Sequence, residues 1–127
     1  MRGACKRFFI YRGAWHNGGM SELSKNKCEA CNEATPKLTA DEIATYLGQM
    51  SGWNVIEDHH ITKKWKFKNF VKALAMVNAI GAIAEDEGHH PDIRFGWGYL
   101  EVTLFTHEND GLSKNDFILA AKIDEIQ

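Results

Sequence analysis

The chain of 127 residues lacks the features that mark membrane, secreted and nucleic-acid-binding proteins. No apolar run approaches the roughly 18 residues of a membrane-spanning helix, so we expect no membrane segment. Three cysteines are an odd number and too few for a disulfide framework, which favours a reducing compartment, by default the cytoplasm. A formal net charge of −2 gives no general electrostatic case for nucleic acid. The 44% hydrophobic and 25% charged residues are typical of one globular domain.

The first 19 residues differ in charge from the rest. They carry four basic residues and no acidic residue, so the remainder has 11 basic and 17 acidic residues, a net charge of −6. The segment partly fits a mitochondrial-type targeting peptide, which is arginine-rich and poor in acids. We favour a basic, disordered N-terminal extension over residues 1–19, with Met20 as the natural start.

Residues 20–37 form an N-terminal arm whose one motif is Cys28-Glu29-Ala30-Cys31. This CxxC spacing is used by zinc sites and by thioredoxin-like proteins. Zinc needs two further ligands, there is no second CxxC, and His59-His60 is the one candidate pair outside the central histidine cluster. No βαβ pattern flanks the motif, as a thioredoxin fold would require. We therefore expect incidental thiols, with a zinc site as the alternative.

Residues 38–127 carry the signals of a folded domain. A capping box at Thr39 begins a first helix, which Gly52 ends. A second capping box at Ser113 begins the last helix. Asn69 caps a longer helix that Gly88 ends. Apolar and polar residues alternate in the other segments, as in a sheet with one wet face. The expected elements are helices at 39–50, 69–87 and 113–126 and strands at 53–58, 61–68, 92–97 and 99–106. This α-β-β-α-β-β-α order predicts an α+β fold, a four-stranded antiparallel sheet with helices packed on one face.

The helix at 69–87 has an apolar surface wider than a sheet requires. One stripe contains Phe70, Leu74, Val77 and Ile80 or Ala84, and Val71, Met76 and Ile83 widen it. A helix lying on a sheet needs an apolar stripe of about 100° or somewhat more. We therefore expect a second face of this helix to be buried against another subunit. The alternative is a helix that its own chain covers more completely.

Three histidines follow this helix within a short segment: His89, His90 and His107. Imidazole has an unperturbed pKa of about 6.5, so it can both donate and accept protons near neutral pH. Pro91 pushes His90 into extended backbone, where neighbouring residues point in different directions. His89 and His90 are therefore not expected to chelate one metal, and could line two sides of a pocket.

Two carboxylates accompany the histidines. Glu85 lies one helical turn before His89 and could orient or polarise an imidazole. Asp116 could do the same for His107, although its capping-box position is also a sufficient structural role. A single surface histidine is usually a solvated side chain, and three histidines with two carboxylates weaken that interpretation. The cluster indicates proton transfer.

The complete pattern resembles the signature of the pterin-4a-carbinolamine dehydratases, also called 4a-hydroxytetrahydrobiopterin dehydratases. The residues that carry the resemblance are Glu85, His89, His90, Pro91, Trp97, His107 and Asp116. It covers about residues 38–127. The arm with Cys28 and Cys31 is similar to bacterial members that serve phenylalanine hydroxylase, whereas residues 1–19 match nothing in the family.

The resemblance implies a dehydration of a pterin substrate. An aromatic amino acid hydroxylase leaves its pterin as a 4a-carbinolamine, and the enzyme expels the hydroxyl as water to give the quinonoid dihydropterin. The reaction needs an acid for the leaving hydroxyl and a base for the N5 proton, and histidines suit both tasks. Which histidine takes which role stays open, as does the choice between tetrahydrobiopterin and tetrahydromonapterin.

The resemblance also implies the members of the site. The catalytic set is His89, His90 and His107, supported by the carboxylates of Glu85 and Asp116. The substrate contacts are His89, His90, Pro91, Trp97, Thr106, His107, Glu108 and Asn109. No metal or organic cofactor is implied, because the pterin is the substrate.

The family's assembly implies a homodimer through the sheet edge, or a homotetramer through the helix at 69–87. The apolar width of that helix agrees with this expectation. The alternative function is a non-catalytic protein-binding module on the same fold.

Overall fold

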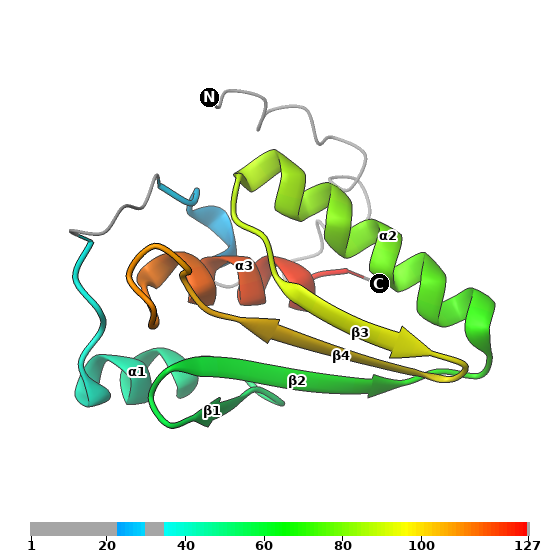
Figure 1. Cartoon of the computed structure of the whole chain (residues 1–127), viewed down its shortest axis with the longest axis horizontal. Helices are drawn as coiled ribbons and strands as arrows, with labels where there is room; N and C mark the ends of the chain where they lie inside the picture. Colours follow the sequence, from blue (N-terminus) through cyan, green and yellow to red (C-terminus); the bar gives the residue numbers. More distant parts are fainter. Residues whose placement is uncertain (1–22, 30–34, 127) are drawn as a thin grey trace.

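The computed structural model describes residues 23–29 and 35–126. Within these residues it contains a 3₁₀ helix, three α-helices and one four-stranded sheet (Figure 1). The α-helices and strands follow the order that the sequence predicts, whereas the 3₁₀ helix was not predicted. The elements are η3 (Leu23–Lys25), α1 (Ala40–Leu47), β1 (Asn54–Ile56), β2 (His60–Lys66), α2 (Phe70–Glu87), β3 (Asp92–Gly96), β4 (Tyr99–Leu104) and α3 (Lys114–Asp124). The proposed extension at 1–19 and Cys31 lie outside the described residues. None of the described helices could cross a lipid bilayer.

The sheet has the strand order β1-β2-β4-β3, and all neighbouring strands are antiparallel. One face is largely apolar, and its central residues are fully buried, as at Ile61 of β2 and Val102 of β4. The other face is polar, and Lys64 pairs there with Glu101 across the two central strands. All three α-helices pack their apolar residues on the covered face, with α2 along the β3 side of the sheet (Figure 1). The predicted α+β fold is therefore confirmed.

The first helix begins as predicted and ends earlier. The capping box is complete, because Thr39 Oγ1 accepts from the Glu42 amide at 3.2 Å and Glu42 Oε1 accepts from the Thr39 amide at 2.9 Å. The helix ends at Leu47 with Gly48 as its cap, whereas the expected end was Met50. Residues 49 and 50 continue in tighter turns whose amides bond three residues back. Gly52, with φ +89°, instead shapes the approach to β1.

The long helix α2 has both predicted ends. Asn69 Oδ1 accepts from the Lys72 amide at 2.9 Å, and Gly88 ends the helix with φ +70°. The residues that face the sheet differ from the expected stripe, because Phe70 is 43% and Leu74 38% exposed. The buried side chains are Ala73, Ile80, Ile83 and Ala84. The helix is thus turned so that the small Ala73 and Ala84 side chains meet the core, which leaves Leu74 on its flank.

The strands are shorter than the sequence pattern suggests. β1 covers only three residues, and Glu57, Asp58 and His59 form the turn into β2, so His60 belongs to a strand and not to the turn. β4 ends at Leu104, where its pairing with β2 ends, and the later pair of Thr106 with Gly111 is an isolated bridge within the following loop. The last helix likewise ends at Asp124 instead of residue 126, and its chain leaves in three-residue turns.

Residues 23–29, the arm segment, pack on the side of α3 that faces away from the sheet. Leu23 is 3% exposed and belongs to the core. The Cys28 amide donates to Glu87 Oε1 at 2.9 Å, which ties the segment to the end of α2. The Asn115 side chain pairs with both backbone groups of Glu29, at 2.9 and 2.5 Å. The arm segment and the sheet therefore enclose α3 between them, which explains why that helix is buried almost all round.

Candidate active site

The centre of the site is a buried imidazole paired with a buried carboxylate. Gly88 ends α2, and the next residue, His89, is 8% exposed. Its Nε2 lies 2.6 Å from Oδ1 of Asp116, which is fully buried in the first turn of α3. Burial strengthens such a pair, because little solvent competes for either partner.

The second oxygen of Asp116 joins this pair to the chain after β4. Oδ2 accepts from the Thr106 hydroxyl at 2.8 Å and from the Ser113 amide at 2.9 Å. The capping bond of α3 therefore comes from the same carboxylate that orients His89. The expectation that Asp116 orients His107 is wrong, because Asp116 points into the core and His107 is exposed.

The second carboxylate, that of Glu85, pairs with His90 at the surface. His90 Nε2 lies 2.6 Å from Glu85 Oε2, with side-chain exposures of 58% and 80%. Since His89 faces the core and His90 faces solvent, the two imidazoles point in different directions, as the extended backbone predicts. Water screens the pair of His90 with Glu85, so it is weaker than the buried pair.

His107 lies on a short loop that Thr106 and Gly111 close with backbone bonds of 2.7 and 3.3 Å. Its ring contacts Phe105, with the ring centroids 4.2 Å apart. Within the described residues, no hydrogen-bond partner is found for either ring nitrogen of His107. Because Thr106 bonds to Asp116, that carboxylate links buried His89 to the loop that carries His107.

The remaining predicted contacts fall in different places. Pro91 is half-buried beside His90, and Glu108 is exposed on the loop of His107. Asn109 is 8% exposed and donates to the Thr35 carbonyl at 3.0 Å, while its buried Oδ1 has no partner in the part of the chain that the structure describes. Trp97, 71% exposed, occupies the turn between β3 and β4.

The strand register separates Trp97 from the histidines within one chain. Gly96, next to Trp97, pairs with Tyr99, whereas the His90 end of β3 pairs with Thr103. Four strand steps at about 3.3 Å place the two ends roughly 13 Å apart. The assignment of Trp97 to the substrate site therefore stays a prediction that one chain alone does not support geometrically.

Sequence reasoning missed a second group of rings beside the loop of His107. His59 Nε2 lies 2.9 Å from Asp110 Oδ1, and the His59 ring lies 4.8 Å from that of Phe105. The hydrogen bond from His59, followed by its charge, lowers the pKa of the Asp110 carboxyl. Strand parity places Phe105 and His107 on one face, but the pairing of His59 with Asp110 joins turns 51 residues apart and has no local signal.

The arm segment shows no metal site among the described residues. No group of three histidine, cysteine or acidic side chains in 23–29 and 35–126 could hold an ion. The Cys28 thiol donates to the Asn115 carbonyl at 3.7 Å, and burial followed by the nearby Glu87 charge raises the pKa of that thiol. The zinc alternative needs Cys31, which lies outside the described residues.

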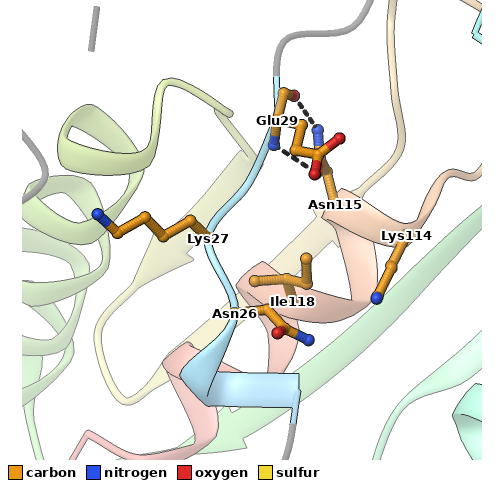
Figure 2. Close-up of a pocket in the computed structure, with 6 residues that line it drawn as sticks. All are labelled: Asn26, Lys27, Glu29, Lys114, Asn115 and Ile118. Atoms are coloured by element: carbon orange, nitrogen blue, oxygen red, sulfur yellow. Dashed lines mark hydrogen bonds between the residues drawn. The ribbon is translucent and has the colours of Figure 1, made fainter. Parts of the chain in front are cut away.

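A cavity of about 270 Å³ lies between the arm segment and α3 (Figure 2). Its lining is Asn26, Lys27, Glu29, Lys114, Asn115 and Ile118. In Figure 2 the Asn115 amide is occupied by the Glu29 backbone, and the lining includes none of the histidines. The cavity is therefore separate from the histidine site.

Comparison with known proteins gives one family. The family described as pterin 4 alpha carbinolamine dehydratase matches residues 36–126. A protein of Alkaliphilus metalliredigens is 50% identical over 109 residues, which cover 85% of this chain and 98% of that protein. A protein of Rickettsia canadensis is 48% identical over 106 residues, which cover 83% and 97%. Both bear the name pterin-4-alpha-carbinolamine dehydratase as a provisional assignment.

Two solved structures share the fold. A transcriptional coactivator/pterin dehydratase from Brucella melitensis has a TM-score of 0.66 and 30% identity, covering 70% of this chain and 96% of that one. A pterin dehydratase-like protein described as a RuBisCO assembly factor in the alpha-carboxysome has a TM-score of 0.50 and 27% identity, covering 57% and 86%. From the extent of the family match and these identities, the chain belongs to the pterin 4 alpha carbinolamine dehydratase family.

Proposed function

We propose that the protein dehydrates 4a-hydroxytetrahydropterin to quinonoid dihydropterin and water. The observation that carries the proposal is the buried network in which Asp116 holds His89 and, through Thr106, the loop of His107. In the reaction the C4a–O bond breaks, the leaving hydroxyl takes a proton from an acid, and a base removes the proton on N5. Paired imidazoles near neutral pH supply both groups.

The three histidines have different environments that suit this division. Asp116 occupies Nε2 of His89 and Glu85 occupies Nε2 of His90, so the Nδ1 atoms are the nitrogens that can exchange protons with substrate. His107 has both ring nitrogens available within the described part of the chain. We assign catalysis to these three histidines, with the two carboxylates orienting two of them.

Recognition of the pterin is assigned to the loop at 106–109 and to His89, His90 and Pro91. Asn109 supports this assignment, because its buried Oδ1 has no hydrogen-bond partner among the described residues and would accept from an N–H of the heterocycle once the loop admits the substrate. The pterin is the substrate in this scheme, and neither a metal nor an organic cofactor takes part.

The test follows the ultraviolet conversion of freshly generated 4a-hydroxytetrahydropterin. Wild-type protein is compared with His107→Ala and with Lys66→Ala, a control on the exposed face of β2. Removing one acid–base group costs about 10²- to 10⁴-fold, so His107→Ala should lose that much of kcat while its circular dichroism stays unchanged. Equal rates for all three proteins would reject the role of His107, and no acceleration by wild type would reject the dehydratase.

The product of the proposed reaction, quinonoid dihydropterin, suggests a physiological role. We propose that the protein returns the pterin cofactor to an aromatic amino acid hydroxylase, phenylalanine hydroxylase, in the cytoplasm. Added to a hydroxylase reaction in which carbinolamine breakdown limits turnover, the protein should raise tyrosine formation, and His107→Ala should not. Equal tyrosine formation with and without active protein would contradict this role.

We also propose a homo-oligomer that uses the uncovered side of α2 and the sheet edge. Val71 is 70% and Leu74 38% exposed, and both are apolar residues on a helix that one sheet does not cover. In light scattering coupled to size exclusion, the wild type should be a dimer or tetramer, and Val71→Glu should lower the mass if α2 forms the interface. A monomeric wild type would instead favour the protein-binding alternative, for which this exposed surface is the supporting observation.

A further inference from the structure

Two turns from distant parts of the chain meet beside His107. The β1–β2 turn brings His59 within 2.9 Å of Asp110, which follows His107 on its loop. His59 Nδ1 also lies 3.1 Å from His60 Nδ1, at the first residue of β2. The β1–β2 turn is therefore connected both to the rigid sheet and to the loop that carries His107.

A series of ring contacts runs parallel to this bond. The His59 ring lies 4.8 Å from the Phe105 ring, and the Phe105 ring lies 4.2 Å from the His107 ring. Phe105 thus lies in contact with both imidazoles, and a shift of its ring would displace His107. Close ring pairs of this kind contribute about 0.5–1.5 kcal/mol beyond the area that they bury.

Both turns adopt backbone conformations that side chains disfavour. Glu57 and Asp58 on one side and Asp110 on the other each have φ of +54°, in the left-handed region. Non-glycine residues rarely adopt this region, and such backbone persists where surrounding contacts over-determine it. Here the hydrogen bond between His59 and Asp110 is a side-chain contact that joins the two turns.

We propose that His59 is a positioning residue for His107, acting through Asp110 and Phe105. This inference rests on the proposed dehydratase function, in which His107 transfers a proton. His59 itself does not touch the reacting atoms in this proposal. Its bond to Asp110 fixes the loop, and its ring fixes the Phe105 ring against which His107 lies.

Four variants separate these contacts. His59→Ala removes the bond and the ring, and His59→Phe restores a ring without the bond. Asp110→Asn removes the charge but keeps a residue that tolerates left-handed backbone. The fourth variant combines His59→Ala with Asp110→Asn, and Lys64→Ala on the exposed sheet face is the control.

The kinetic arm measures kcat and KM of the dehydration. A displacement of about 1 Å can cost on the order of a hundredfold, so we expect His59→Ala to lose about tenfold or more in kcat with little change in KM. His59→Phe should recover part of the loss. The double variant should lose no more than His59→Ala, because the charge of Asp110 has no effect on His107 once its His59 partner is gone. The inference would be overturned if the kcat losses of the two single variants multiplied in the double variant. It would also be overturned if kcat of His59→Ala stayed within twofold of wild type.

The second arm does not depend on activity. The ring proton signals of His107 are followed by nuclear magnetic resonance, after assignment with His107→Ala. We expect His59→Ala and Asp110→Asn to shift them toward the values of an unstructured peptide, and Lys64→Ala to leave them in place. An unmoved His107 signal would overturn the inference even if activity falls. If wild type lacks dehydratase activity while the signals move, the proposed function fails and the positioning of His107 stands.

Discussion

The sharpest prediction concerns Asp116, because one fully buried carboxylate accepts bonds from three parts of the fold. Asp116→Ala leaves His89, the Thr106 hydroxyl and the Ser113 amide without their partner. A hydrogen bond to a charged group contributes about 1.5–3 kcal/mol. Three such losses, taken at the lower value, lower the free energy of unfolding by about 4–5 kcal/mol. The free energy of unfolding of a typical domain is about 5–15 kcal/mol, so this loss is a large share of it.

Asp116→Asn separates the structural role of this residue from its charge. The amide oxygen can still accept from Ser113 and Thr106, while the NH₂ group faces Nε2 of His89 and requires that nitrogen to be an acceptor. We expect a loss of only about 1–2 kcal/mol in the free energy of unfolding. Dehydration should fall by about a hundredfold or more, because the imidazole is held in the opposite tautomer and its protonated form loses its counter-ion.

Urea unfolding followed by tryptophan fluorescence measures the first effect, and the ultraviolet dehydration assay measures the second. Asp92→Ala, which removes an exposed carboxylate from β3, is the matched control and should change the free energy of unfolding by less than about 0.5 kcal/mol. If the free energy of unfolding of Asp116→Ala were within about 1 kcal/mol of wild type, the three hydrogen bonds would not stabilise the fold as argued. Full activity of Asp116→Asn would refute the role of the charge.

Two further predictions concern residues away from the histidines. Trp53→Phe removes the 3.0 Å hydrogen bond from the buried indole N–H, at a residue that is 6% exposed, to Asp124. We expect the free energy of unfolding to fall by about 2 kcal/mol, and an unchanged melting temperature would contradict this prediction. Burial, followed by the Glu87 charge, raises the pKa of the Cys28 thiol above its ordinary value of 9.0, so the native thiol stays protonated. The free energy of unfolding should therefore fall as the pH rises above 9.0, where only the unfolded chain ionises. Peptide mass spectrometry should find slow alkylation of Cys28 in native protein and fast alkylation in urea; equal rates would count against this.

Local signals predicted the architecture well because they act over a few residues. The caps at Thr39 and Asn69 and the left-handed Gly88 are decided by hydrogen bonds within one turn of helix. The alternation along β2 and β4 follows from one buried face. Element ends were less accurate, as at Leu47, because the last turns loosen into three-residue bonds for which the sequence has no strong marker.

The pairing of the site residues could not be predicted in the same way. His107 and Asp116 are near in sequence, which suggested that they interact, but the turn at 106–111 exposes His107 while α3 directs Asp116 inward. The partner of Asp116 is His89, 27 residues away. Its position depends on how α2 and α3 pack on the sheet, and periodicity does not encode that packing.

Asp116 has two functions in one position, and this affects how variants of the site should be interpreted. Its Oδ2 caps α3 through the Ser113 amide, and its Oδ1 orients His89. A capping box alone would explain the residue, so its sequence context could not reveal the second function. A substitution that removes both oxygens therefore lowers stability and activity together, and lost activity would not by itself identify a catalytic residue. Only the variant that keeps the cap and changes the partner of His89 tests the chemistry.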